Sequence, residues 1–236
     1  MKVKFQYIVL LAFCAIVISC EKDNYDAPSS KLSGRLVYQG QPIGGLERDQ
    51  VPFELYQFGF GKVGPIGASF TQEATFSAVL FDGNYKLIIP NGQGPFVWKK
   101  TGAGAPDTIP ITLAGSQQLD LEVTPYYLIK GPQITGAGGK VSATFGLQKV
   151  ITGTGAQDIE NANLYINKTQ FVSESSVDRV AKTTIAGTAI TDVSNISLQV
   201  TVPTLQPTQN YVFARVGIKI KNVEDRLYSP VVKVTF

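Results

Sequence analysis

Hydrophobic side chains alternate with polar ones along most of this chain, in short runs separated by Gly, Pro, Asn and Asp. A two-residue period is typical of a β-strand with one buried and one solvent face, and no helical stripe is sustained beyond the N-terminus. Runs of this kind occupy residues 32–38, 51–60, 75–81, 85–89, 118–123, 141–148, 196–202 and 232–236. The pattern predicts an all-β protein with antiparallel sheets, each buried on one face.

Two tandem antiparallel β-sandwich domains are predicted, at residues 32–124 and 125–236, with Pro125 at the boundary. Each half has roughly 100 residues, which is enough for an independent hydrophobic core. Within the first half, Asp82-Gly83 has the composition of a two-residue hairpin turn.

The first residues have a different pattern, because the run from Tyr7 to Ile18 is apolar without interruption. A membrane-spanning helix needs ~20 such residues, so this run has the length of a signal peptide's apolar region. The following Ser19-Cys20 junction resembles a bacterial lipobox, in which residues 1–19 are removed and the cysteine is lipidated. The alternative is an ordinary signal peptide with an incidental cysteine.

Residues 20–31 are predicted to form a lipid-anchored acidic tether. Glu21, Asp23 and Asp26 follow the cysteine closely and resemble the signal that sends Bacteroidota lipoproteins to the outer face of the outer membrane. The alternative is a polar linker that needs charge only to stay solvated. We therefore expect an outer-membrane protein that is anchored through Cys20 and faces the cell exterior.

Composition argues against most catalytic chemistry. The chain has no histidine, and its second cysteine, Cys14, lies within the predicted signal peptide. The commonest general base and the usual Cys/His zinc sites are thereby excluded from the mature chain. The formal net charge of 21 − 18 = +3 falls to +1 without Lys2 and Lys4, so nothing indicates a nucleic-acid partner. We expect no metal, no cofactor and no enzymatic activity.

Short motifs in each half resemble known β-domains. Leu32-x-Gly34, Gly40-x-Pro42 and Asp82-Gly83-Asn84-Tyr85 resemble the transthyretin-like domains called carboxypeptidase-regulatory-like, which are usually scaffolds or adhesive modules. The segment from Leu205 to Tyr211 resembles the fibronectin type III and immunoglobulin-like signature, in which the tyrosine forms a corner. A bulge near Ala214 would reconcile this tyrosine with the apolar face that follows it.

The whole layout also resembles a two-domain family of Bacteroidota outer-membrane lipoproteins of unknown function. The matching pieces are Cys20, Asp23-Asn24-Tyr25 with Pro28, Leu32-x-Gly34, Gly94-Pro95-Phe96, Trp98, residues 123–127, residues 214–217 and residues 228–230. This resemblance implies an association with starch-utilisation-type glycan import systems.

Four aromatic residues are candidates for carbohydrate binding, because aromatic rings stack on the apolar faces of sugars. Phe96 and Trp98 lie between two glycine-rich loops, and Tyr126 and Tyr127 lie at the predicted domain boundary. The alternatives are core packing for Trp98 and interdomain packing for the tyrosines. Separately, Thr108 in Asp107-Thr108-Ile109 resembles an acceptor for O-glycosylation in Bacteroidota.

These patterns predict a non-catalytic, surface-exposed lipoprotein that binds glycan as an accessory component of a polysaccharide uptake system. The expected partners are membrane lipid through Cys20, a glycan ligand and outer-membrane import proteins. The alternative is a structural or adhesive spacer that binds a protein partner at the outer membrane.

Overall fold

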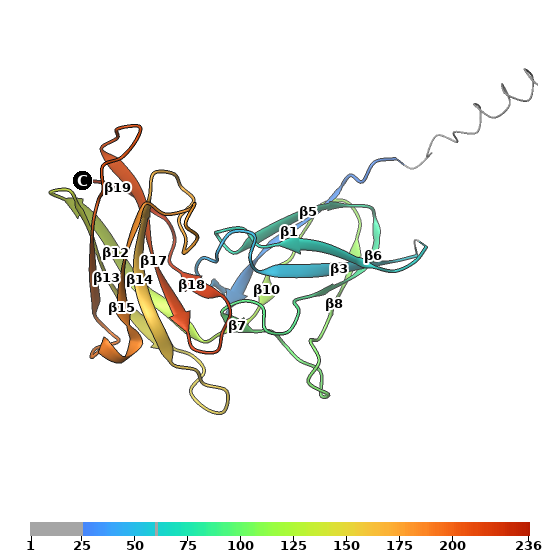
Figure 1. The fold of residues 1–236 in the computed structure, drawn as a ribbon. Helices are drawn as coiled ribbons and strands as arrows, with labels where there is room; N and C mark the ends of the chain where they lie inside the picture. The colour runs from blue at the N-terminus through green and yellow to red at the C-terminus, as the bar shows by residue number, and fades with distance from the viewer. Residues whose placement is uncertain (1–25, 60) are drawn as a thin grey trace, which may run out of the picture.

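The computed structural model describes residues 26–59 and 61–236, and regular structure in these ranges is almost entirely β-strand (Figure 1). The elements are β1 (Ser30–Tyr38), β2 (Gln41–Pro42), β3 (Pro52–Phe58), β4 (Pro65–Ser69), β5 (Thr75–Leu80), β6 (Gly83–Ile88), β7 (Phe96–Val97), β8 (Ile109–Leu113), β9 (Gln117–Gln118), β10 (Leu121–Glu122), β11 (Thr124–Pro125), β12 (Tyr127–Ala137), β13 (Lys140–Lys149), β14 (Ile159–Asn167), β15 (Ala181–Ala186), η1 (Gly187–Ala189), β16 (Ile196–Thr201), β17 (Tyr211–Ile220), β18 (Arg226–Tyr228) and β19 (Val232–Thr235). The predicted all-β class with two tandem β-sandwich domains is confirmed. Cys20 and the predicted signal peptide lie outside the described residues.

The N-terminal domain packs two sheets around an aromatic core. One sheet is centred on β1, which pairs antiparallel with β2 and β5 and parallel with β9 and β10; the other has the order β4-β3-β6-β8. Phe53, Phe70 and Phe76 pack between them, with ring centroids 5.0–5.8 Å apart. Such tilted and edge-on contacts add to the stability that burial itself provides.

Strand β1 follows its sequence pattern. Leu32, Gly34 and Leu36 are buried, while Lys31 and Arg35 are exposed. A Cβ atom added at Gly34 would lie 1.9 Å from the backbone oxygen of Leu119, so only glycine permits the close passage of that segment.

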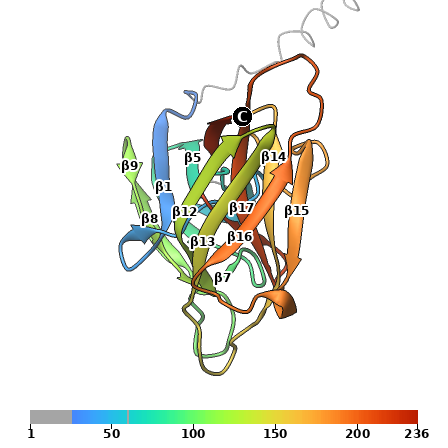
Figure 2. The same cartoon turned by 90° about the vertical axis from the view of Figure 1, so that its left-hand side faces the viewer.

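The C-terminal domain has the sheets β12-β13-β16 and β15-β14-β17-β18, with β19 also paired to β17. The first of these sheets faces the viewer in Figure 2. The core of the C-terminal domain is mainly aliphatic and comes from both sheets. Its fully buried residues include Val141, Leu164, Val216 and Ile218. No helix in the described ranges is long and apolar enough to cross a membrane.

Strand β17 has no bulge near Ala214, so the feature that would reconcile Tyr211 with the apolar face after it is missing. Pairing between β14 and β17 runs unbroken through Ile166–Ala214 and Tyr165–Arg215. Tyr211 therefore stays half-buried, with the Lys233 ammonium 3.9 Å from its ring centroid. The alternation is lost because the middle of β17 is buried on both faces, and one of them carries Arg215, which contacts the N-terminal domain.

The chain passes from one core to the other between Val123 and Tyr127. Between these residues, β11 pairs antiparallel with β7, and the two strands form a short ribbon at the junction. Gly45 of the N-terminal domain also forms a β-bridge with Tyr228 of β18. Figure 1 shows β7, β10 and β18 together where the domains meet.

Candidate functional site

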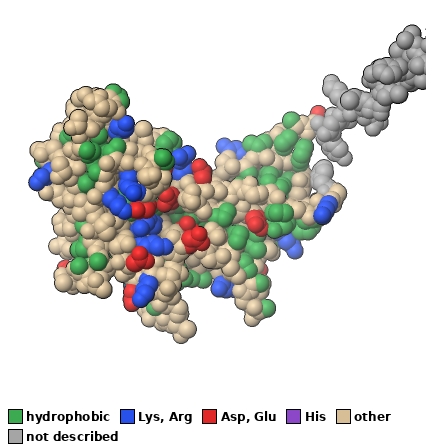
Figure 3. Space-filling model, viewed as in Figure 1, with side chains coloured by type: hydrophobic (Ala, Val, Ile, Leu, Met, Phe, Trp, Pro, Cys, Tyr) green, Lys and Arg blue, Asp and Glu red, His purple; other side chains and the backbone are tan. Residues whose placement is uncertain are grey.

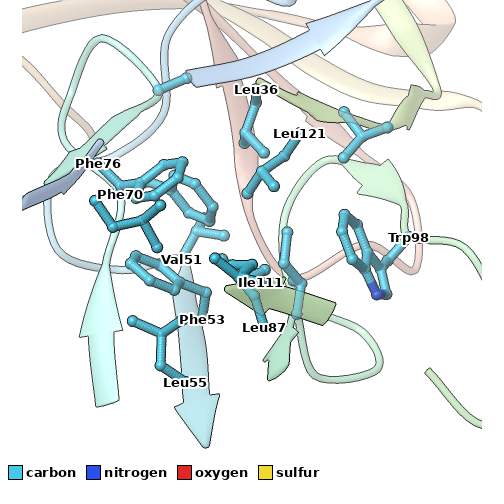
Figure 4. Close-up of a cluster of buried hydrophobic side chains, with 14 of the residues drawn as sticks. Leu36, Val51, Phe53, Leu55, Phe70, Phe76, Leu87, Trp98, Ile111 and Leu121 are labelled. Carbon is cyan, nitrogen blue, oxygen red and sulfur yellow. The ribbon is translucent and has the colours of Figure 1, made fainter. Parts of the chain in front are cut away.

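Phe96 and Trp98 lie in the core of the N-terminal domain. Trp98 is 5% exposed (Figure 4) and Phe96 is 4% exposed. The indole Nε1 of Trp98 donates a hydrogen bond to the backbone oxygen of Asp107, 2.8 Å away. Of the two possibilities that the sequence left open for Trp98, core packing is therefore the one that the structure has, and Phe96 packs in the same core. Phe96 lies in β7 and Trp98 directly follows it, so both side chains lie on the same face of this segment. That face packs against the core of the N-terminal domain.

Two hollows nevertheless flank this segment, and together we call them the junction groove. Both are lined by Val97, Trp98 and Lys100, and their volumes are about 160 and 430 Å³. The smaller hollow is also lined by Asn91, Gly92, Gln93, Gly94, Phe96, Tyr126, Asn222 and Val223. The larger is also lined by Lys99, Glu122, Val123 and Thr124. The larger hollow has the volume of a small-ligand pocket, and the smaller could take only part of a ligand.

The two tyrosines that were candidates for carbohydrate binding line different pockets. Tyr126 is half-buried and lines the junction groove together with Phe96 and Trp98. Tyr127 is 5% exposed, and it lines a different pocket of about 410 Å³ beside Lys149 and Asp158. Three of the four aromatic candidates thus line the same hollow, and only Tyr126 among them is partly exposed.

Three side-chain amides supply polar groups to the groove. Asn91 and Gln93 come from the Gly/Pro-rich loop before β7, and Asn222 comes from the turn between β17 and β18. Asn222 donates to the side-chain oxygen of Gln157 at 3.0 Å. The side chains of Asn91 and Gln93 make no hydrogen bond within the described residues, so their donors and acceptors are available to a ligand. None of the three was predicted from the sequence, because Asn and Gln are common in turns and only the fold brings these residues together.

One hydrogen bond ties the loop of the groove to the other domain. The backbone N–H of Gly94 donates to Asp225 Oδ2 at 2.7 Å. Burial raises the pKa of the Asp225 carboxyl, and the bond from Gly94 acts in the opposite direction. Gly94 has φ +80, and a Cβ atom there would lie 2.3 Å from the Phe96 ring. Only glycine therefore fits here, where the loop packs against the Phe96 ring of one domain and bonds to Asp225 of the other.

The charged side chains of the groove are mainly cationic. Lys99 lies 3.6 Å from the Asp107 carboxylate and 5.8 Å from the Trp98 ring centroid. Lys100 is exposed and makes no ion pair within the described residues. Glu122 accepts a hydrogen bond from the backbone of Gln39 and is the only carboxylate among the described residues that line the groove.

A buried arginine of the C-terminal domain contacts the N-terminal domain. Arg215 is fully buried, and its Nη1 donates to the backbone oxygen of Leu46 at 2.9 Å. Its guanidinium stacks 3.8 Å from the centroid of Tyr228. Burial lowers its pKa to about 10, although Tyr228 and Glu47 favour the charged form. The Tyr228 hydroxyl in turn donates to Glu47 at 3.1 Å.

Residues 168–180 form a second interdomain contact, which we call the clasp loop. The amide of Gln72 binds its backbone twice, donating to the oxygen of Gln170 and accepting from the N–H of Val172, each at 3.0 Å. The Arg48 guanidinium lies 4.4 Å from the Phe171 ring centroid. Figure 3 shows acidic and basic side chains gathered on this face where the domains meet. The groove is therefore built on a fixed domain arrangement.

Glu174 anchors the clasp loop to its own domain. It accepts a hydrogen bond from the Tyr165 hydroxyl at 2.7 Å and forms ion pairs with Arg179, Lys182 and Arg226. Burial acts to raise the pKa of its carboxyl, but the bonds from Lys182 and Tyr165 and the charge of Arg226 outweigh burial and lower the pKa.

The remaining candidate residues stay predictions. Thr108 is half-buried just before β8, where its N–H donates to the Asp107 carboxylate at 2.8 Å. Lipidation of Cys20 concerns a residue outside the described ranges. In residues 26–59 and 61–236, no cluster of three or more His, Cys, Asp or Glu side chains could hold a metal ion.

Comparison with known proteins identifies relatives of both domains. A family model described as the N-terminal domain of a protein of unknown function, DUF3823, matches residues 30–124. A second, described as a domain of unknown function, DUF3823_C, matches residues 127–233. No curated protein matches the chain significantly.

Several solved structures share the whole two-domain arrangement. A DUF3823 family protein from Parabacteroides merdae is 31% identical, with a TM-score of 0.75 over 89% of this chain and 100% of that one. Another from Bacteroides ovatus is 26% identical, with a TM-score of 0.74 over 88% of this chain and 99% of that one. A Bacteroides uniformis protein described as a candidate carbohydrate binding protein is 16% identical, with a TM-score of 0.66 over 89% and 100%. At that identity the likeness shows the fold alone.

Proposed function

This chain belongs to the DUF3823 family, and on that basis we propose that it is a lipid-anchored, non-catalytic surface protein that binds glycan in the junction groove. The observation that carries the proposal is the groove itself. It combines the half-exposed ring of Tyr126, the unpaired amides of Asn91 and Gln93, and the ammonium of Lys100. Sugar hydroxyls need such mixed donors and acceptors, and a nearby aromatic ring contacts the apolar face of the sugar.

Two further observations support a glycan ligand. The structural neighbour from Bacteroides uniformis is described as a candidate carbohydrate binding protein. In addition, the lipobox-like Ser19-Cys20 would place the groove outside the cell, where polysaccharides are met. A role beside outer-membrane import proteins is part of the same proposal.

The groove favours binding over hydrolysis. Most glycosidases use a pair of carboxyl groups on either side of the scissile bond. The described residues lining the groove contribute one carboxylate, that of Glu122, and the chain has no histidine.

Affinity electrophoresis through gels that contain plant or host polysaccharides tests the proposal. We expect one class of polysaccharide to retard the native protein. Gln93→Ala and Lys100→Ala should each weaken this retention about 5–10-fold, the equivalent of one lost hydrogen bond of about 1 kcal/mol.

Lys140→Ala is the matched control, because Lys140 is equally exposed but lies at the end of β13 opposite to the junction. The proposal fails if no polysaccharide retards the native protein. It also fails if the groove variants and the control are retarded alike.

The second candidate function is a spacer that holds a protein partner away from the membrane. The observation in its favour is the fixed domain arrangement, with Arg215 buried between the domains and Gln72 bound to the clasp loop. Cross-linking in intact cells should then recover an outer-membrane protein. Recovery of the uncross-linked monomer alone would exclude this function.

A further inference from the structure

Three exposed apolar side chains lie on one hairpin of the N-terminal domain, and a fourth lies on the outer face of the other sheet. Among the described residues, eight large hydrophobic side chains are exposed, and four of these belong to this domain. They are Phe58 (41% exposed), Val63 (42%), Ile66 (38%) and Val79 (61%). Phe58, Val63 and Ile66 lie on the hairpin between β3 and β4, and Val79 lies near the end of β5.

Strand registers place this hairpin at the end of the domain where the tether enters. Phe58 pairs with Asn84, at the start of β6. Two residues earlier, Asp82 accepts a hydrogen bond from Ser30, the first residue of β1. Val79 of β5 pairs with Lys31, the second residue of β1. Figure 1 shows the β3–β4 hairpin and the start of β1 at the same end of the domain, far from the C-terminal domain.

Basic side chains surround the apolar ones. Lys31, Lys62 and Lys86 are all exposed at this end, and the Lys86 ammonium lies 5.5 Å from the Phe58 ring centroid. The acidic side chains at this end of the described chain are Asp26, Asp82 and, further along β3, Glu54, which accepts a hydrogen bond from the Tyr56 hydroxyl. The tether also carries Glu21 and Asp23, which lie outside the described residues. The Asp82 carboxylate is already engaged by the Ser30 hydroxyl and the backbone N–H of Gly115.

We propose that this end of the domain is a second membrane contact, in which the β3–β4 hairpin inserts into the lipid surface beside the anchor. This inference rests on the proposed lipidation of Cys20. Residues 21–29 separate that cysteine from β1, and the ten backbone steps from Cys20 to Ser30 span at most about 35 Å. The anchor therefore allows the hairpin to reach the bilayer. Apolar side chains flanked by lysines can insert about 5–10 Å into the boundary between lipid headgroups and acyl chains, especially where the lipids are anionic.

Such a contact would orient the molecule. The junction groove lies at the opposite end of the N-terminal domain from the hairpin, since β7 and β11 adjoin the C-terminal domain. Insertion of the hairpin would thus hold the groove away from the membrane and open to the medium.

Site-specific fluorescence tests the proposal on the full lipidated chain. The mature sequence has no cysteine other than Cys20, so Val63→Cys creates a single labelling site for an environment-sensitive dye. The labelled protein is reconstituted into vesicles of phosphatidylethanolamine and phosphatidylglycerol that carry spin-labelled acyl chains. Val177→Cys is the control, because Val177 is 80% exposed on the clasp loop of the other domain.

We expect the lipid spin labels to quench the dye at position 63 several-fold more than the dye at position 177. Equal quenching at both positions would overturn the proposal. It would also be overturned if position 63 were shielded from a water-soluble quencher but not reached by the lipid labels, because that result indicates a protein partner.

The outcome is separable from the proposals on which it rests. Failure of lipidation appears as protein that does not co-sediment with the vesicles. Failure of glycan binding appears only in the gel assay, where the labelled variants and the native protein should behave alike.

Discussion

Burial decides what the aromatic residues of this protein do. In the sequence, Trp98 resembles a residue that stacks against a sugar ring, since it is a single tryptophan between glycine-rich loops. Yet its ring packs into the core and its N–H is bonded to Asp107. Alternation along two or three residues cannot show which face of a short strand is covered, because the covering segments come from distant parts of the chain.

We expect Trp98→Ala to lower the free energy of unfolding by about 3–5 kcal/mol, the usual cost of emptying a large aromatic site in a core. Phe58→Ala serves as control, because Phe58 is an exposed aromatic of the same domain; its change should stay within about 0.5 kcal/mol. Urea unfolding measures both. A Trp98→Ala protein of native stability would contradict the assignment of Trp98 to the core.

Arg215 was not singled out from the sequence, because a strand with one exposed face accommodates a charged residue there. The second domain covers that face, and only the tertiary fold reveals it. Glu47 is half-buried near the guanidinium and accepts hydrogen bonds from Tyr228 and Ser173.

Glu47→Ala should therefore destabilise the protein by roughly 1–3 kcal/mol, since two hydroxyls lose their acceptor and a buried cation loses a nearby carboxylate. Asp120→Ala removes an exposed ion pair with Arg35 and should cost less than about 1 kcal/mol. Thermal unfolding of the two variants compares them. Similar melting temperatures would show that the interdomain network contributes little to stability.

At the level of secondary structure, long strands with regular alternation were predictable and short connecting strands were not. β1, β5, β6, β13 and β16 coincide with alternating runs in the sequence. The two-residue strands β7 and β11 are too short to show an alternation of their own, and they form by pairing with each other although they are far apart in the sequence. The junction groove depends on these strands, which is why its residues could be identified only in part.

The loop before β7 gives an element-level prediction. Gly92 and Gly94 have nearly equal φ values, +82 and +80, but a Cβ atom at Gly92 meets nothing within 4 Å. Gly92→Ala should cost about 1 kcal/mol of backbone strain. Gly94→Ala should cost clearly more, because it adds a clash with the Phe96 ring. Equal losses in chemical unfolding would show that the loop relaxes away from the ring.

The clasp loop should make stability depend on pH through Glu174. Because the pKa of Glu174 in the fold is below its ordinary value of 4.5, its contribution is complete above that pH. The contribution is lost as pH falls through the folded pKa. Glu174→Gln should thus lower stability at neutral pH by roughly 1–3 kcal/mol, and the deficit should shrink as the solution is acidified.

Urea unfolding of the native protein and Glu174→Gln at successive pH values measures this deficit. Glu160→Gln is the control, since Glu160 is an exposed acid on the neighbouring strand β14. A deficit that stays constant into acid would show that the glutamate acts through packing and not through its charge.

At the scale of the whole molecule, the two cores, the ribbon between them and the clasp loop make one fixed arrangement with two distinct ends. The junction groove lies between the domains, and the apolar hairpin lies where the tether enters. Sequence patterns predicted the number and class of the domains. They could not predict the interface, because its residues come from strands and loops that are far apart in the chain.

Trp98 is the only tryptophan in the protein and forms part of the wall of the junction groove. Its fluorescence therefore reports binding there directly, when the protein is titrated with oligosaccharides of the class that retards it in gels. We expect a saturable change in Trp98 emission that weakens in Gln93→Ala and is unchanged in Lys140→Ala. Saturable binding by calorimetry without any change in Trp98 emission, or no binding at all, would contradict this expectation.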